Sequence, residues 1–316
     1  MKFLRYLTIA ALLILVGLAL WFLAQNADAI PPLLNGLLMV SLPLALGIWV
    51  ARRYKQDWRL YGIGAATFVL SQVLHIPFNL WLLNPFMENM GWSVEGGPAQ
   101  LALIGVALGL SSGIFEETAR LLVLRRWLKD ARSWAEGLMF GAGHGGMEAM
   151  LLGAVVIYVF LQFVVLLGAS PEALAGLAGA DNVDIVQGQM DAYWGANWYD
   201  HLLGALERVS AMCFHLSAAL LVMKAVVSGH SRWYWAAVGW HALLNGVSVF
   251  GLHTLGAYAV EGILLVFAAL SLFIVVRLRH SLQEFTPEPP APAPLEVTPL
   301  KPATPSREKI EDSRYD

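Results

Sequence analysis

Two adjacent glutamates stand in the middle of an apolar stretch of this sequence. Glu116 and Glu117 follow residues 111–115, and Arg120 comes four positions after Glu116. Side chains four apart lie on one face of a helix, so Arg120 can pair with Glu116. Glu117 then points about 100° away and needs another partner. Because ionisable groups in an apolar helix are costly, both glutamates are candidate functional residues.

Three histidines occupy three later apolar stretches, and two of them have a polar residue four positions on. His144 precedes Glu148 in a glycine-rich run, and we expect Glu148 to orient His144 through its second ring nitrogen. The glycines would let a neighbouring helix approach closely. His241 precedes Asn245 on one helix face, and His215 lies between these two stretches.

The stretch that carries His215 also holds an acid and a base. His201, Arg208 and His215 recur every seven residues, so they share one stripe of a helix. Glu207 and Arg208 lie toward the start of this stretch. We expect them to form an ion network that locks neighbouring helices together.

The five candidate groups lie at similar depths in their stretches. The spacings are eight residues from Glu117 to Arg125, ten from Trp134 to His144, nine from His215 to Lys224 and nine from Arg232 to His241. With the α-helical rise of about 1.5 Å per residue, these counts place the groups roughly 12–15 Å from the same end of the helix bundle. We therefore expect two glutamates and three histidines, on four helices, to meet in one layer.

Such a layer suits a divalent metal, with zinc favoured, and a catalytic zinc site keeps one position open for a water nucleophile. A second carboxylate can take and return the proton, and Asn245 can donate a hydrogen bond to an oxyanion. The chemistry indicated is amide hydrolysis, although the His-Glu-x-x-His helix is absent from the sequence. The predicted ligands are Glu117, His144, His215 and His241; the predicted catalytic residues are Glu116, Glu117, His144 and Asn245; the supporting residues are Arg120, Glu148, Glu207 and Arg208.

The composition around these residues is that of a membrane protein. The chain is 58% hydrophobic and 14% charged, whereas soluble proteins average about 25% charged residues. A helix needs about 20 apolar residues to cross a bilayer, and the backbone of each crossing should be helical. Eight stretches qualify: 6–24, 33–50, 60–83, 99–124, 135–168, 202–227, 233–251 and 255–276. The prediction is an all-α membrane bundle of about eight spans, with its catalytic core at 99–251.

The basic residues indicate an orientation. Lysine and arginine precede the first stretch, follow the eighth, and gather in every second connection, at 52–59, 125–132 and 224–232. Basic connections stay in the cytoplasm, so we expect a plasma-membrane protein with both termini cytoplasmic. The net charge of −3 gives no indication of nucleic-acid binding.

The segments outside the spans carry further expectations. Residues 1–29 could be a signal peptide, but the apolar run is long for one, so we favour a retained helix in a domain of residues 1–284. Residues 169–200 form an acidic loop that ends in aromatic pairs. Residues 285–316 hold eight of the fifteen prolines and are predicted to be a disordered cytoplasmic tail. The single cysteine, Cys213, excludes an intrachain disulfide and is expected to be a packed core thiol.

Three motifs carry a resemblance to a known family. Glu116-Glu117-x-x-Arg120, Phe140-x-x-x-His144 and His241-x-x-x-Asn245 resemble motifs of the CAAX-protease and bacteriocin-processing membrane family, which is allied to the PrsW proteases and the anterior-pharynx-defective subunits of gamma-secretase. The run 141–149 and His215 are similar to its YhfC-type branch. The resemblance covers roughly residues 111–250. It implies that one glutamate and His144 activate water, and that His241 and Asn245 stabilise the oxyanion.

The leading hypothesis is a metal-dependent endopeptidase that cleaves a membrane-associated protein or peptide in the bilayer. The alternative is a non-enzymatic membrane protein, either a metal or proton transporter or a scaffold with an inactive site, because intramembrane His and Glu chains also relay protons. Transporters often show repeated halves, and we find no internal repeat in the sequence.

Overall fold

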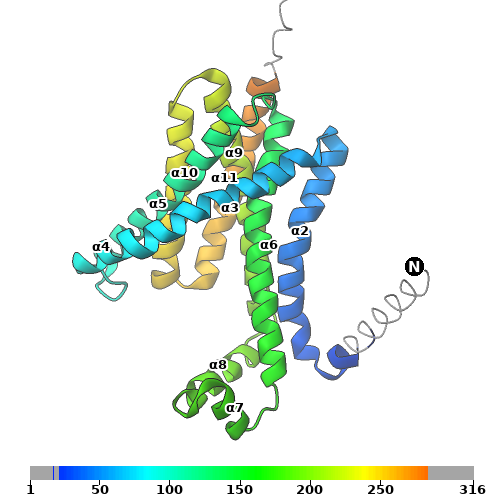
Figure 1. Cartoon of the computed structure of the whole chain (residues 1–316), viewed down its shortest axis with the longest axis vertical. Coiled ribbons are helices and arrows are strands. Elements are labelled where there is room, and N and C mark those ends of the chain that lie inside the picture. The colour runs from blue at the N-terminus through cyan, green and yellow to red at the C-terminus, as the bar shows by residue number, and fades with distance from the viewer. Residues whose placement is uncertain (1–16, 18–20, 284–316) are drawn as a thin grey trace, which may run out of the picture. The chain divides into compact units, whose positions relative to one another are not determined.

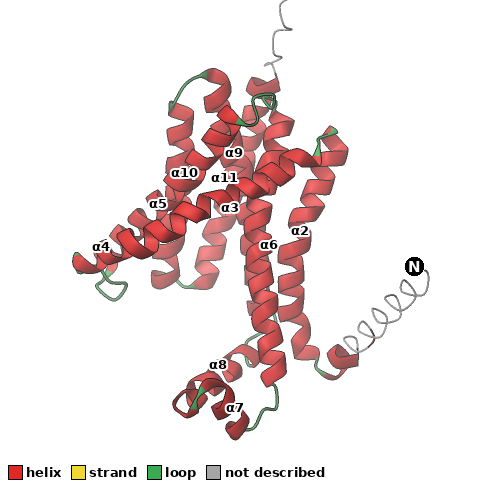
Figure 2. Cartoon of the chain, viewed as in Figure 1, coloured by secondary structure: helices red, strands yellow, loops and turns green. Residues whose placement is uncertain are grey.

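The computed structural model describes residues 17 and 21–283, and within them the chain is a bundle of helices without strands (Figures 1 and 2). Seven of these described helices are long and apolar enough to cross a membrane. The predicted all-α membrane bundle is confirmed. The first predicted span, 6–24, lies largely outside the described residues, as does the proline-rich tail.

The long helices follow the predicted spans closely. Their bounds, with those of the shorter elements, are α2 (Ile30–Tyr54), α3 (Trp58–Phe78), the π-helical segment η2 (Asn79–Leu83), α4 (Asn84–Asn89), α5 (Pro98–Arg126), α6 (Trp134–Leu166), α7 (Pro171–Ala178), α8 (Val183–Trp194), α9 (Leu203–Ser228), α10 (Arg232–Thr254) and α11 (Ala257–Gln283). Residues 169–200, predicted as a loop, instead form α7 and α8. Ser170 caps α7 and Pro171 occupies its first turn, a pattern that favours helix initiation.

Local sequence signals set the ends of the helices that carry the site. Ser133 and Glu136 form a reciprocal capping box at the start of α6. Asp57 accepts a hydrogen bond from the backbone of Arg59 at the start of α3. Gly229, at φ 70°, ends α9 in the left-handed conformation that favours glycine. These signals fix where each helix begins or ends, and hence the depth of each buried polar residue.

The seven helices pack with α9 at the centre. In α9, 72% of the apolar window is buried, which is possible because α2, α5, α6, α10 and α11 all contact it. Helices α2 and α3 pack along α6, and α5 packs along α10. The structure thus places the four helices with candidate groups, α5, α6, α9 and α10, next to one another.

Glycines allow two of these contacts to be very close. A Cβ added at Gly143 of α6 would lie 2.0 Å from the carbonyl oxygen of Tyr61 on α3, and one at Gly109 of α5 would lie 2.4 Å from that of Ala242 on α10. No side chain fits at such distances. The predicted role of the glycine-rich run in close helix packing is confirmed.

The ends of the bundle differ in the charge of their connections. We call the end with the connections 55–57, 127–133 and 229–231 the basic side, and the end with 90–97, 167–199 and 255–256 the acidic side. Helices α7 and α8 lie beyond the end of α6 on the acidic side (Figure 1). Toward the basic side lies a large apolar core whose members include Leu124, Phe140 and Leu220, each fully buried.

Candidate metal and catalytic site

The five candidate groups meet inside the bundle, as the depth counts predicted. Glu116 and Glu117 come from α5, His144 from α6, His215 from α9 and His241 from α10, and each is at most 5% exposed. Hydrogen bonds link α5 to α6 and to α10 through these groups. The predicted convergence of four helices on one polar layer is confirmed.

Three of these residues form a group with the spacing of metal ligands. One donor atom from each of Glu116, His144 and His215 lies within 4.8 Å of the others, and Nε2 of His144 is 3.1 Å from Oε2 of Glu116. A carboxylate and two imidazoles are ligands that zinc accepts, and three protein ligands leave a position for water. The donor set therefore fits one divalent metal.

Glu148 orients His215, and the prediction that it would orient His144 is wrong. Oε2 of Glu148 lies 2.7 Å from Nε2 of His215, whereas Nε2 of His144 meets Glu116 from α5. A carboxylate on one ring nitrogen places the proton there and leaves the lone pair on the other. Nδ1 of His215 is thereby left as the nitrogen that can bind a metal.

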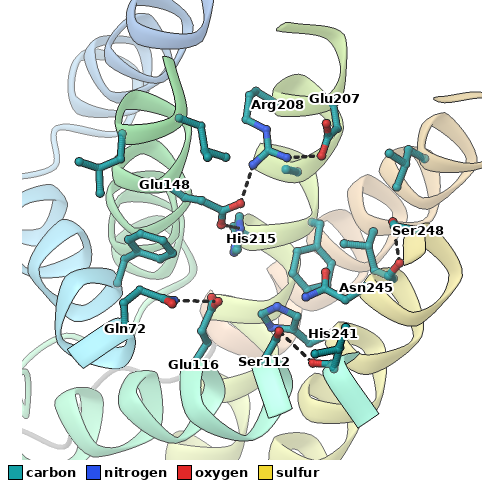
Figure 3. A pocket seen from close by; sticks show the side chains of 18 of the residues that line it. Gln72, Ser112, Glu116, Glu148, Glu207, Arg208, His215, His241, Asn245 and Ser248 are labelled. Atoms are coloured by element: carbon teal, nitrogen blue, oxygen red, sulfur yellow. Dashed lines mark hydrogen bonds and ion pairs between the residues drawn. The ribbon is translucent and has the colours of Figure 1, made fainter. Parts of the chain in front are cut away.

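The predicted ion network of α9 is present and also reaches α6. Nη1 of Arg208 lies 2.5 Å from Oε1 of Glu148, and Nη2 contacts Glu207 (Figure 3). Arg208 is buried, while the Glu207 side chain is 44% exposed. Glu148 therefore accepts hydrogen bonds from both Arg208 and His215, and this joins the ion network to the candidate ligands.

Arg120 lies at the centre of the site and is fully buried. Its Nη1 pairs with Glu117, and its Nη2 lies 3.7 Å from Oε2 of Glu116. The predicted pairing with Glu116 is thus extended to both glutamates, which explains how two adjacent carboxylates can be buried. Nη2 also lies 2.7 Å from Nδ1 of His215, so Arg120 would have to release this nitrogen for a metal to bind there.

Glu117 and His241 form a pair of their own. Nδ1 of His241 lies 2.8 Å from Oε1 of Glu117, and this is the second partner that Glu117 required. Both residues were predicted as ligands, but they lie outside the group of three. Asn245, one turn along α10, lines the same cavity as His241 (Figure 3).

A cavity of about 630 Å³ adjoins the site. Glu116, His215 and His241 contribute to its wall. The rest of the wall is largely apolar and includes Phe68, Leu108, Leu152, Phe214, Leu244 and Leu264; its polar members include Gln72, Ser112, Glu148, Arg208, Asn245 and Ser248. A substrate in this cavity would reach the candidate ligands through an apolar space.

Sequence reasoning left Gln72 and His75 out of the site. Nε2 of Gln72 lies 3.2 Å from Oε1 of Glu116, and Nδ1 of His75 lies 3.2 Å from Oε1 of Gln72. Asn79 meets the other ring nitrogen of His75 at 3.0 Å. Gln72, His75 and Asn79 are spaced by three and then four positions along the continuous helical stretch of α3 and η2, and this spacing is the signal that could have identified them.

The fold and the site define a class of protein: a multi-pass helical membrane protein with a buried glutamate–histidine cluster. A family model described as YhfC intramembrane metalloprotease matches residues 38–267, and the chain belongs to this family. The uncharacterized membrane protein YhfC of Bacillus subtilis (strain 168) is 31% identical over 260 residues, which cover 79% of this chain and 96% of that relative. No solved structure matches the chain. The predicted resemblance to the YhfC-type branch is confirmed.

Proposed function

We propose that this protein is a metal-dependent endopeptidase that hydrolyses a peptide bond of a membrane-associated protein or peptide. The observation that carries the proposal is the group of Glu116, His144 and His215, with donor atoms within 4.8 Å, inside a bundle of membrane-spanning helices. The description of the family that matches the chain supports it.

The three residues of this group would hold the metal, with zinc favoured because two imidazoles and a carboxylate suit it. When bound, the metal supplies a water activated near neutral pH and a Lewis acid for the peptide carbonyl. Glu148 fixes the ring of His215 for this role. Arg120 balances the charge of both buried glutamates.

Glu117 and His241, which lie beside the three candidate ligands, would transfer the proton. Glu117 holds His241 through Nδ1, which leaves Nε2 as the ring nitrogen that can take a proton from the attacking water and return it to the leaving amine. Asn245 lies one helical turn along α10 in the same cavity wall. Its amide group would donate a hydrogen bond to the oxyanion that forms on the carbonyl.

The test is to measure bound zinc and peptide cleavage together in purified protein. We expect His144→Ala and Glu116→Gln to lose both bound zinc and cleavage of a membrane-anchored reporter peptide. Thr67→Ala is the control and should keep both, because the Thr67 hydroxyl is buried on α3, bonds a carbonyl of its own helix and does not line the cavity. Bound zinc and cleavage that are unchanged in both site variants would refute the proposal.

One observation favours a second candidate function. Arg208, Glu148, His215, Arg120 and Glu117 form a continuous chain of bonded ionisable groups across the bundle. Such chains also serve as proton relays in transporters. Uptake of zinc or protons into proteoliposomes, blocked by Glu148→Gln, together with no cleavage of any reporter, would favour transport.

A further inference from the structure

The cavity lies on one side of the glutamate–histidine layer. Membrane-spanning helices that follow one another in the chain run in opposite directions. A shift toward the acidic side therefore means lower residue numbers on α5 and α9 and higher numbers on α3, α6 and α10. The lining residues lie on the acidic side of the layer on all four helices that carry it: Leu108 and Ser112 on α5, Leu151 and Leu152 on α6, Glu207 and Ala211 on α9, and Asn245 and Ser248 on α10. The cavity therefore extends from the layer toward the acidic side.

The opposite side of the layer is filled with apolar side chains. Leu124, Phe140 and Leu220 are fully buried there, and none of them lines the cavity. Close backbone contact adds to this packing, since a Cβ at Gly64 of α3 would lie 2.1 Å from the carbonyl oxygen of Phe140. On α5, α6, α9 and α10, none of the residues that line the cavity lies on the basic side of the layer.

The wall of the cavity indicates what it accepts. A volume of about 630 Å³ lies within the range of roughly 300–1,000 Å³ of ligand pockets, which suits a short stretch of chain better than a whole helix. Most of the wall is apolar. The polar wall residues Ser112, Asn245 and Ser248 can bond the backbone of an unwound segment, whose groups must be satisfied away from water.

We infer that the substrate enters from the acidic side, as an unwound apolar segment of a membrane-anchored peptide. This inference rests on the proposed function. It also predicts that water for hydrolysis arrives from that side, past Glu207 and Arg208, because the cavity extends from the layer in that direction.

The single cysteine of the chain makes the side of access measurable without catalysis. Cys213 was predicted to be a packed core thiol, but it is only half-buried. Because it is the single cysteine of the sequence, Cys213→Ala provides a cysteine-free background. Ser248→Cys then reports on the cavity, Ala180→Cys on the acidic side and Ser231→Cys on the basic side; the last two positions are exposed. A membrane-impermeant thiol reagent is added to one face of oriented proteoliposomes.

We expect Ser248→Cys to react from the same face as Ala180→Cys and from the face opposite to Ser231→Cys. A membrane-anchored oligoleucine peptide should slow the labelling of Ser248→Cys at least tenfold and leave Ala180→Cys unchanged. Reaction from the face of Ser231→Cys would overturn the side of access, and unchanged labelling in the presence of the peptide would overturn the apolar occupant. Labelling as expected without peptide cleavage would instead count against the proposed function alone.

A second inference comes from a different observation, a row of hydrogen bonds that ends at Glu116. The hydroxyl of Ser111 lies 2.7 Å from Oδ1 of Asn79, where the π-helical segment begins. Nδ2 of Asn79 lies 3.0 Å from Nε2 of His75, and Gln72 bridges His75 and Glu116. π-helical segments occur often at functional sites.

The donors and acceptors in this row agree in direction. Glu116 accepts from the amide nitrogen of Gln72, so the amide oxygen of Gln72 faces His75 and accepts from Nδ1. Nε2 of His75 is then free to accept from the amide nitrogen of Asn79. Each residue in the row thus donates a hydrogen bond to the residue that follows it, in the order Ser111, Asn79, His75, Gln72 and Glu116. The last bond, from Gln72, holds Oε1 of Glu116. Oε2 of Glu116 is left to face His144.

The geometry points to Gln72 and His75 as positioning residues for Glu116, a role that rests on the proposed metal site. Groups that orient a ligand change metal affinity by about 10- to 100-fold when removed. We expect Gln72→Met, which keeps the length of the side chain but cannot hydrogen-bond, to weaken zinc binding about tenfold. His75→Ala should have a similar effect through Gln72.

Zinc competition with a chromophoric chelator, in the purified full chain, measures this effect apart from stability. His75→Gln, which can still donate and accept, should restore most of the affinity, and His253→Ala, at the exposed end of α10, is the matched control. Equal zinc affinity in Gln72→Met and the unchanged chain would overturn the assignment. A fall in melting temperature with unchanged affinity would also overturn it, because the row would then be structural only.

Discussion

Glu148 on α6 and His215 on α9 are joined by a hydrogen bond of 2.7 Å between Oε2 and Nε2. The bond connects the helix that carries His144 to the helix at the centre of the bundle. The second oxygen of Glu148 accepts from Arg208 at 2.5 Å, so the carboxylate is held from two directions. The direction in which the lone pair of His215 points therefore depends on one carboxylate, whose side chain is 22% exposed.

Replacing Glu148 should weaken metal binding while the fold is kept. Glu148→Ala removes the group that fixes the ring of His215, and we expect zinc affinity to fall about 10- to 100-fold. Isothermal titration in detergent measures the affinity. Glu207→Gln is the control, because Glu207 contacts Arg208 but bonds none of the candidate ligands; if both variants bind zinc equally, Glu148 has no part in orienting a ligand.

Replacing Arg120 should make the stability of the protein depend on metal. Arg120 is the buried cation beside Glu116 and Glu117, and loss of one partner of a buried ion pair costs about 3–5 kcal/mol. Arg120→Gln should therefore melt at a lower temperature than the unchanged chain. Zinc should raise the melting temperature of this variant more than that of the unchanged chain, because Zn²⁺ can replace the lost positive charge. In the variant, Zn²⁺ also no longer competes with Arg120 for Nδ1 of His215.

Thermal unfolding with and without zinc checks this expectation. Arg59→Gln is the control, because Arg59 and Asp130 form an exposed pair of the kind that contributes at most about 1 kcal/mol. If zinc shifts the melting temperature of Arg120→Gln no more than that of Arg59→Gln, the metal does not bind beside the two glutamates.

The depth of the site could be predicted from sequence, whereas the partners within it could not. Arg125 and Arg232 mark the basic-side ends of their helices. Because the helical rise per residue is constant, the number of residues from these ends gives the depth of Glu117 and of His241. Pairs four apart, such as Glu116 and Arg120, follow from helical periodicity alone. Both kinds of inference use only one helix at a time. The depths and the pair of Glu116 and Arg120 were confirmed, whereas the pair of His144 and Glu148, also four apart, was wrong.

Partners on different helices depend on how each helix is rotated about its axis. The close contact of Gly109 with Ala242 sets α5 against α10 and brings Glu117 to His241. Glu116 then faces His144 on α6. Such rotations arise from packing between distant segments, so the sequence did not show which of two adjacent glutamates would join the ligand group. For the same reason it assigned Glu148 to the wrong histidine.

Adding one methyl group at Gly143 should destabilise the bundle. The added Cβ of Gly143→Ala would lie 2.0 Å from the carbonyl oxygen of Tyr61, so α3 and α6 must move apart, and overpacking of this kind typically costs about 1–3 kcal/mol. Gly239→Ala is the matched control on α10, where the added Cβ meets nothing within 4 Å and alanine should stabilise the helix by about 0.5–1 kcal/mol. Equal unfolding free energies in urea for the two variants would contradict the close packing of α3 on α6.

Replacing Asn245 should separate oxyanion stabilisation from metal binding. Asn245 lines the cavity one turn from His241 and is not among the three residues with ligand spacing. We therefore expect Asn245→Ala to keep its zinc affinity and to lower kcat for a membrane-anchored reporter by about 10²- to 10³-fold, the usual effect of removing one oxyanion donor. Steady-state kinetics and a zinc titration check the two expectations. Thr254→Ala, at the exposed end of the same helix and outside the cavity wall, is the control. An unchanged kcat would show that the amide of Asn245 does not reach the carbonyl under attack, and a parallel loss of zinc would place Asn245 with the ligands instead.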